Sequence, residues 1–265
     1  MTASLRRIGA LCLRYTYLIG SSWPRLLELI YWPILNLLTW GFLQTYAMTS
    51  TNSTLFVGGA LVSGLLLWEI LFRGQIGFSI SFLEEVWSRN LGNVLMSPIR
   101  PFEFVAALMV MSLARLAVGM VPATLLAMAF FGFDLARLGI GLAAFFALLV
   151  VTGWAVGLVV AGLILRHGLG AESLAWTIMF VFWPLCCVYY PLSVLPAWLQ
   201  PVALALPPTH VFEGMRAVLA EGVLRLDHLT AAALLNVLWI VAAAFAFAAL
   251  LDRARAAGSL LASGE

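Results

Sequence analysis

The charged residues that lie deepest in apolar sequence are a carboxylate, Glu69, and an arginine, Arg115. Glu69 precedes the polar residue Ser81 by 12 positions, and Arg115 follows Glu103 by 12 positions. At ~1.5 Å of helix rise per residue, both would lie roughly 18 Å from the same membrane surface. Because an unpaired charge at such a depth costs about 2.5–3.5 kcal/mol, we predict an ion pair between them, with a structural role favoured over gating. Arg73, one helical turn beyond Glu69, is the competing partner.

Other reactive side chains form no catalytic or metal-binding pattern. The three histidines, His167, His210 and His228, are spread over separate loops without a spacing such as HExxH. The three cysteines lie inside apolar or amphipathic segments and indicate neither a disulfide framework nor a metal site. The sequence therefore gives little support to a membrane-embedded enzyme.

The chain contains no lysine, since all 14 of its basic side chains are arginines. A P-loop needs a lysine that reaches the terminal phosphates of the nucleotide. We therefore expect no cofactor on this chain. If ATP drives its action, ATP and Mg²⁺ must be bound by a separate partner ATPase.

The composition is typical of a polytopic membrane protein. Hydrophobic residues make up 63% of the 265 residues, charged residues make up 10%, and the mean hydropathy is +1.04. A soluble globule of this length would need more polar surface, and a net charge of +2 is too small to indicate nucleic-acid binding. We predict an all-α polytopic membrane protein in contact with membrane lipid, with residues 1–265 forming a single transmembrane domain.

Six transmembrane helices are predicted from the apolar runs. They cover about residues 26–48, 55–80, 104–131, 138–165, 173–190 and 229–251, so that spans 1 and 2 occupy residues 26–80 and spans 3 to 5 occupy residues 104–190. In the fourth run, Gly153 and Gly157 form a GxxxG pattern that would allow close packing of two helices. Residues 252–265 are expected to form a short polar tail.

Residues 1–25 predict an amphipathic helix that lies in the membrane interface. One face carries Leu5, Ile8, Cys12, Tyr15 and Ile19. The neighbouring arginines are expected to extend toward lipid phosphates while this face enters the acyl boundary. The alternative, a secretory signal peptide, is disfavoured because Arg14 interrupts the apolar run.

A polar stretch between the second and third predicted spans, residues 81–103, must lie in water. Its middle has helical spacing, with charges beside an apolar stripe, and Pro98 and Pro101 end it. We interpret this stretch as an amphipathic helix presented to a partner outside the lipid; the alternative is a solvated loop. The residues expected to contact that partner are Glu84, Glu85, Trp87, Arg89, Asn90 and Leu91.

Residues 191–222 are apolar enough to touch lipid but cannot form one clean span. They contain five prolines, and proline breaks a helix long enough to cross the hydrocarbon. We predict two short helices here that dip into the outer membrane surface and return without crossing.

The arginines predict the orientation in the membrane. With both termini inside, ten arginines fall on the cytoplasmic side and three on the outer side, and Arg115 remains within a span. This bias is the one expected for cytoplasmic loops. The stretch 81–103 is therefore predicted to face the cytoplasm.

Two runs of residues resemble a known family, the membrane (permease) subunits of type-2 ATP-binding-cassette (ABC) transporters, which are mostly exporters. The run LGNVLMSPIRPFEF, residues 91–104, is similar to the family's passage from a coupling helix through Ser/Thr-Pro into the third span. The run 190–216 is similar to the family's proline-marked segment, and its marker residues are Pro191, Pro196, Pro207 and Arg216. In the coupling helix, where many members read Gly-Thr-Leu-Glu, this chain reads Arg89-Asn90-Leu91-Gly92.

The resemblance implies the permease subunit of an ABC exporter in the bacterial inner membrane, with both termini cytoplasmic. Its partners would be two copies of a cytoplasmic ABC ATPase and a second copy of itself, as a homodimer, or a similar permease. A hydrophobic or amphiphilic substrate, such as a drug, a lipid or a lipid-linked glycan, would pass between the two copies. Candidate path-lining residues are Trp40, Tyr46 and Tyr189. A secondary transporter or channel is the alternative, although only Glu69 among the carboxylates qualifies as intramembrane and no internal repeat is evident.

Overall fold

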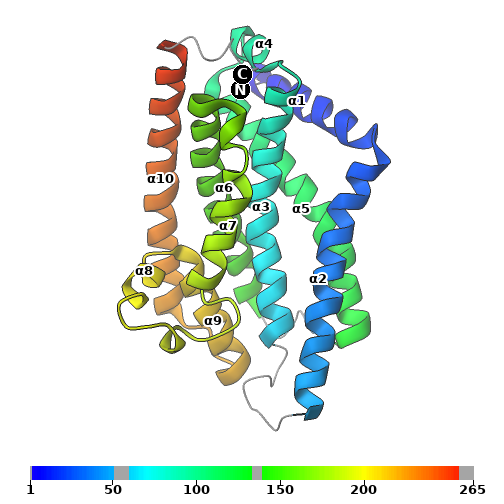
Figure 1. Ribbon diagram of the computed structural model, residues 1–265, viewed down its shortest axis with the longest axis vertical. Helices are drawn as coiled ribbons and strands as arrows, with labels where there is room; N and C mark the ends of the chain where they lie inside the picture. The colour runs from blue at the N-terminus through cyan, green and yellow to red at the C-terminus, as the bar shows by residue number, and fades with distance from the viewer. Residues whose placement is uncertain (1, 51–59, 133–138, 257–265) are drawn as a thin grey trace.

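The protein is a bundle of helices, which Figure 1 shows along its length. The computed structural model describes residues 2–50, 60–132 and 139–256, and every regular element of these residues is helical. The first elements are α1 (Thr2–Gly20), α2 (Trp23–Ser50), α3 (Ala60–Trp87), α4 (Leu91–Met96), α5 (Pro101–Phe131) and α6 (Gly139–His167). They are followed by the 3₁₀ turn η3 (Gly168–Ala171), α7 (Leu174–Leu185), the 3₁₀ turn η4 (Leu192–Val194), α8 (Gln200–Leu204), α9 (Pro207–Glu221) and α10 (Leu226–Ala256).

Five helices of the described residues are long and apolar enough to cross a membrane, namely α2, α3, α5, α6 and α10. Even α3, with 28 residues, extends ~42 Å, which exceeds the ~30 Å hydrocarbon core of a bilayer. These helices correspond to five of the six predicted spans. The prediction of an all-α, multi-pass membrane protein is confirmed.

The fifth predicted span, residues 173–190, has a different structure from the other five. Its α-helix, α7, has only 12 residues and extends ~18 Å, which is too short to cross the hydrocarbon alone. The helix ends before Cys187, whose φ of 55° is incompatible with a right-handed helix. Figure 1 shows α7 running from the end of the bundle that carries α4 toward the end that carries α9.

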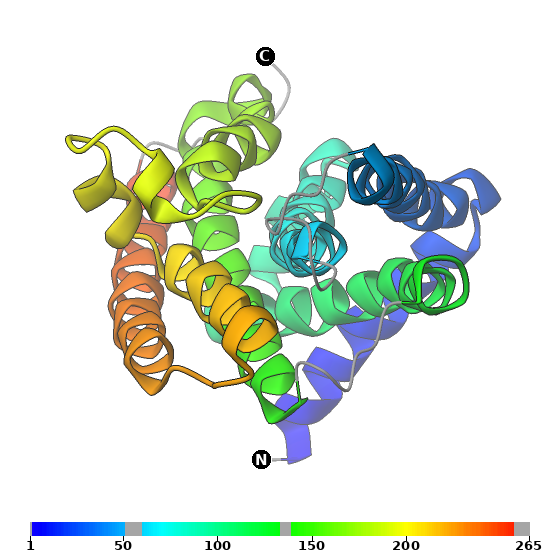
Figure 2. The same cartoon turned by 90° about the horizontal axis from the view of Figure 1, so that it is seen from below.

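Helix α3 is the centre of the bundle. Nearly all of its residues are buried, and it packs against α2, α5 and α6, as Figure 2 shows from below. Glycines allow this close packing: a Cβ atom at Gly153 of α6 would lie 2.9 Å from the backbone nitrogen of Gln75 and 3.0 Å from the carbonyl oxygen of Leu71. A Cβ atom at Gly157 would meet the ring of Phe78. The predicted GxxxG packing is confirmed, and the partner helix is α3.

Helix α1 lies with α4 at one end of the bundle, opposite the end that carries α8 and α9 (Figure 1). It packs mainly against α5. Of its predicted apolar face, Tyr15 and Ile19 are buried within the protein, whereas Leu5 is exposed. The C-terminal half of α1 is therefore held by contacts with the protein as well as by any lipid around it.

The polar stretch 81–103 is divided differently from the prediction. Residues 81–87 complete α3, and only Leu91–Met96 form a separate helix, α4. Arg89 separates the two helices, because its φ of 51° lies in the left-handed region. Pro101 then occupies the first position of α5, where a missing backbone N–H costs nothing.

We expect Gly153→Ala to destabilise the bundle by about 1–3 kcal/mol, because the added Cβ would press on the backbone of α3, which has no flexible end to move aside. The measurement is the unfolding of the detergent-solubilised protein, followed by helical circular dichroism during titration with denaturing detergent. The matched control is Gly9→Ala in α1, where nothing lies within 4 Å of the added Cβ; helix propensity should make that change neutral or stabilising. Equal effects of the two substitutions would contradict the close packing of α3 and α6.

Candidate functional site

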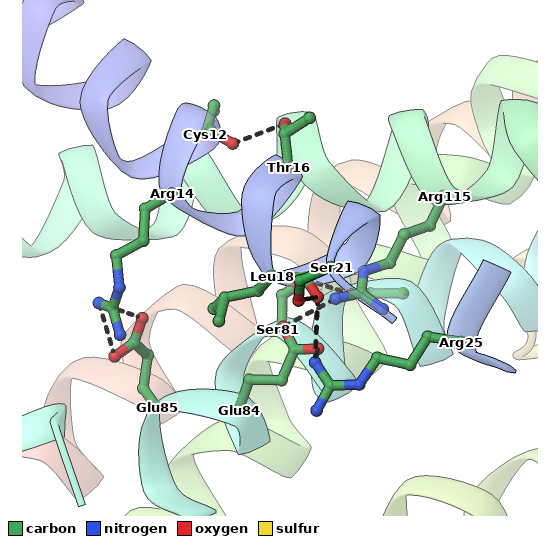
Figure 3. Close-up of polar contacts among 11 residues, drawn as sticks. Cys12, Arg14, Thr16, Leu18, Ser21, Arg25, Ser81, Glu84, Glu85 and Arg115 are labelled. Atoms are coloured by element: carbon green, nitrogen blue, oxygen red, sulfur yellow. Dashed lines mark hydrogen bonds and ion pairs between the residues drawn. The ribbon is translucent and has the colours of Figure 1, made fainter. Parts of the chain in front are cut away.

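The last turns of α3 carry two buried carboxylates, Glu84 and Glu85. Glu84 accepts a hydrogen bond of 2.8 Å from Nη2 of Arg115 on α5. Its other oxygen lies 3.5 Å from Nη1 of Arg25, at the start of α2. Figure 3 shows the two guanidinium groups converging on this one carboxylate. Glu84 therefore joins α2, α3 and α5 at the α4 end of the bundle.

Glu85 joins α1 and α4. Nη1 of Arg14 on α1 lies 2.8 Å and 3.0 Å from its two carboxylate oxygens. Nδ2 of Asn90, the residue before α4, donates to Oε2 at 2.8 Å. The buried phenol of Tyr15 lies in the same cluster, and its pKa is raised by burial first and by the charge of Glu85 second. Tyr15 therefore stays neutral beside the carboxylate.

A third carboxylate, Glu103 in the first turn of α5, is fully buried. Arg7 of α1 binds it with two hydrogen bonds of 2.8 and 2.6 Å, and Ser4 donates a third of 2.6 Å. The backbone N–H of Arg100 donates a fourth, of 2.9 Å, which caps the helix. The hydrogen bonds to Glu103 raise the pKa of Arg7 above its ordinary value.

These pairs correct the prediction that the arginines of residues 1–25 extend toward lipid phosphates. Arg7 and Arg14 pair with protein carboxylates instead. The free-energy cost of leaving a buried carboxylate of α3 or α5 without an opposite charge is larger than the cost of leaving a lipid phosphate in water. The sequence did carry a signal for this arrangement: the two arginines are seven residues apart, which places them on one face of a helix.

The predicted ion pair between Glu69 and Arg115 is wrong. Glu69 accepts a hydrogen bond of 2.8 Å from Nε of Arg73, one turn along the same helix, and another of 2.8 Å from Nδ2 of Asn36 on α2. Both carboxylate oxygens of Glu69 are thus occupied by nearer donors. Arg115 pairs with Glu84, a residue that the prediction had placed at the protein surface.

The residues predicted to contact an ATPase divide into two groups. Glu84, Glu85 and Leu91 are buried, so they are not available for a surface contact. Trp87 and Arg89 are exposed, and Asn90 is half-buried against Glu85. The indole Nε1 of Trp87 donates to Glu172, after the turn η3, at 3.0 Å, so this surface extends to the connection between α6 and α7.

Helix α4 and the ends of four long helices line one apolar crevice. The crevice has no space wide enough for a water molecule. It is lined by Phe82 of α3, Leu91 and Leu95 of α4, Pro101 and Phe104 of α5, Leu165 of α6, and Phe247 and Leu251 of α10. Leu91 and Val94 of α4 are buried in the same hydrophobic core, so α4 is anchored by its apolar side chains at this end of the bundle.

Two of the three predicted path-lining residues lie together. The rings of Trp40 on α2 and Tyr189 after α7 are stacked, with centroids 4.4 Å apart and planes at 22°. Trp183 of α7 meets the edge of Tyr189 and stacks on Trp68 of α3. Tyr46 is not part of this cluster and is 68% exposed on α2. The aromatic cluster therefore closes the seam between α2 and the segment that follows α7.

The proline-marked segment is fastened by α9. Arg216 donates to the carbonyl oxygen of Cys187 at 2.8 Å and pairs with Glu213 at 2.8 Å. Glu213 in turn accepts a hydrogen bond of 2.7 Å from the backbone N–H of Leu192. Of the predicted marker prolines, Pro207 begins α9 and is buried, Pro196 is exposed, and Pro191 precedes the turn η4. Arg216 thus fixes the turn that ends α7.

The bundle of long apolar helices defines a multi-pass membrane protein. The family model of the ABC-2 type transporters matches residues 21–220, from the turn before α2 to the last turn of α9. The chain therefore belongs to the ABC-2 type transporter family. No curated protein matches the chain. Membership of this family implies that the chain is a transport component of the membrane that works with an ATPase subunit.

We expect Arg115→Met to destabilise the protein by about 3–5 kcal/mol, because it leaves the buried Glu84 without its buried partner. The matched change Arg25→Met removes the longer contact of an exposed arginine with the same carboxylate and should cost about 0–1 kcal/mol. Detergent-induced unfolding of the two variants measures the difference. The double variant Glu84→Gln with Arg115→Met should be more stable than Arg115→Met alone, and a double variant that is no more stable would argue against a direct pair.

Proposed function

We propose that this chain is the permease subunit of an ATP-driven exporter in the bacterial inner membrane. Two copies of a separate ABC ATPase would power it, and it would act as a homodimer or together with a similar permease. The substrate would be hydrophobic or amphiphilic: a drug, a lipid or a lipid-linked glycan. The observation that carries the proposal is the seat of α4, a six-residue helix whose apolar side lines one crevice together with the ends of four long helices.

The surface beside α4 has the chemistry of a docking site for a soluble partner. Trp87 and Met96 are 44% and 73% exposed, and they stand beside the exposed polar side chains of Arg89 and Asn93. Apolar anchors surrounded by polar groups are the arrangement that a protein partner recognises. We infer that α4 is the coupling helix, that its exposed side binds the ATPase, and that its buried side passes the motion of the ATPase to the spans.

The aromatic seam is the proposed place at which the path opens. Trp40 of α2 and Tyr189 after α7 meet through their stacked rings, and separation of this stack would open the seam. Only 17% of the most apolar window of α2 is buried, against 83% for α3. A second permease copy facing α2 would cover part of this surface and enclose the path.

The arginine distribution supports a cytoplasmic location for α1, α4 and both termini. The end of the bundle that carries α4 also carries several arginines, namely Arg14, Arg25, Arg89 and Arg166. The turn η4 and helices α8 and α9 would then face the outside of the cell.

We expect Arg89→Glu together with Met96→Glu to reduce the amount of ATPase that copurifies with the permease by roughly tenfold or more, which corresponds to about 1.4 kcal/mol of binding free energy. The reason is that one change reverses a charge and the other removes an apolar anchor at the proposed docking site. The matched control is Trp198→Ala, a residue 75% exposed at the opposite end, which should leave copurification unchanged. Undiminished copurification in the double variant would remove this surface from the docking site.

We expect a single cysteine at Ser193, introduced into a cysteine-free background, to react with a membrane-impermeant maleimide added to intact cells. A cysteine at Ser88 should react only after permeabilisation. Both serines are exposed and lie at opposite ends of the bundle, so access alone decides the result. The reverse pattern would overturn the proposed orientation.

A further inference from the structure

Two histidines from separate segments of the sequence lie side by side in the folded chain. His210 lies near the start of α9, and His228 lies in the first turn of α10. Their ring centroids are 5.8 Å apart and their planes are tilted by 44°. Both side chains are partly exposed, so a small ion can reach them from water. The pair belongs neither to the surface beside α4 nor to the aromatic seam.

Helices α9 and α10 hold the two rings at this separation. The helices pack directly against each other and are joined by the short connection 222–225. Gly214 lies one turn after His210 on the same face of α9, and a Cβ atom added to Gly214 would lie 3.7 Å from Cβ of His228. The face of α9 that carries His210 is therefore turned toward α10. Packed helices, and not two long loops, set the distance between the rings.

The hydrogen bond of His210 leaves one of its ring nitrogens available as a ligand. Nε2 of His210 lies 2.9 Å from the carbonyl oxygen of Leu204. Because a carbonyl oxygen only accepts, Nε2 carries the hydrogen, and the lone pair of the neutral ring lies on Nδ1. Histidines that bind metals usually donate their second ring nitrogen to a carbonyl or carboxylate group in this way, which fixes the orientation of the ring. His210 thus already has the supporting contact of a metal ligand.

The distance between the rings suits one shared metal ion. With a Zn–N distance of about 2.0–2.1 Å, two imidazole rings that share an ion have centres about 5.2 Å apart at the tetrahedral angle and at most about 6.4 Å apart. The observed 5.8 Å lies between these limits. Imidazole suits zinc, copper and nickel ions, whereas Mg²⁺ and Ca²⁺ prefer oxygen ligands. The pair therefore has the chemistry of a transition-metal site.

We propose that His210 and His228 form a binding site for a divalent transition-metal ion such as Zn²⁺, which would bridge α9 and α10. Among the residues that the structure describes, no third histidine, cysteine or carboxylate completes a cluster with them. Water would therefore fill the remaining coordination positions, as it does at open zinc sites, and the ion would exchange with its surroundings. The site needs no ATPase, so it goes beyond the proposed function and is testable on the permease alone.

A bridging ion would restrain more than the two helices. Arg216 and Glu213 of α9 hold the backbone of the next segment at Cys187 and Leu192. This segment, which follows α7, contains Tyr189 of the aromatic seam. An ion that ties α9 to α10 would therefore also restrain the backbone on one side of the seam. In the proposed orientation, that ion would bind from outside the cell.

The test uses the full-length permease without a polyhistidine tag, reconstituted into lipid nanodiscs and titrated with Zn²⁺ by isothermal titration calorimetry. Two ligands held together bind an ion more tightly than one ligand, by a factor of roughly 10²–10⁴. We expect His210→Gln and His228→Gln each to weaken Zn²⁺ binding by roughly 10²-fold or more. The matched control is His167→Gln, at the far end of α6, which should bind Zn²⁺ like the wild type.

Hydrogen–deuterium exchange, followed by mass spectrometry on the same samples, separates a bridge from binding to a single imidazole. A bridge predicts that Zn²⁺ slows backbone exchange in the peptides that contain His210 and in those that contain His228, and that either single variant loses both effects. Helical circular dichroism verifies that the glutamine variants are folded. A wild type that binds no Zn²⁺, undiminished affinity in both single variants, or protection of only one of the two helices would overturn the proposal.

Discussion

The arrangement of the α4 end depends on how three buried carboxylates are neutralised. Glu84, Glu85 and Glu103 are each at least nine-tenths buried, and an ion removed from water costs several kcal/mol unless an opposite charge and hydrogen bonds compensate it. Each of the three receives at least one arginine. Because two of those arginines come from α1, the ion pairs that neutralise these carboxylates also fix α1 across the end of the bundle. The position of α1 therefore follows from electrostatics as much as from its apolar face.

The exclusive use of arginine suits this arrangement. Arg7 binds Glu103 through two nitrogens at once, and a guanidinium group presents such paired donors in a fixed plane, whereas an ammonium group does not. Arg115 is held inside the bundle, where its Nη2 donates to Glu84 at 2.8 Å. A buried ion is tolerated where an opposite charge and hydrogen bonds compensate it. The arginines thus supply both the charge and the hydrogen bonds that the buried carboxylates need.

The sequence was sufficient to predict the long helices but not their polar contacts. Hydropathy locates α2, α3, α5, α6 and α10, because each of these helices is apolar over a length that can cross a membrane. It did not reveal that α7 ends at Leu185, shortly before the left-handed residue Cys187, since a left-handed residue leaves no signal in composition. Nor did it identify the partners of Glu69 and Arg115. Two arginines were candidate partners for Glu69: Arg73, one turn along the same helix, and Arg115 on the next span. Glu69 pairs with Arg73, because a contact within one helix does not depend on how two helices are aligned.

Arg89 has a backbone conformation that is unusual for a residue with a side chain. Its φ of 51° is one that glycine adopts freely and that costs other residues about 1–2 kcal/mol. The strain is tolerated because the neighbours on both sides are fixed: Asn90 is bound to Glu85 through its backbone N–H and its side chain, and Trp87 is bound to Glu172. The left-handed turn directs α4 back over the ends of α3, α5, α6 and α10. The path of the chain into α4 is therefore set by the contacts on either side of Arg89, whose own side chain is exposed.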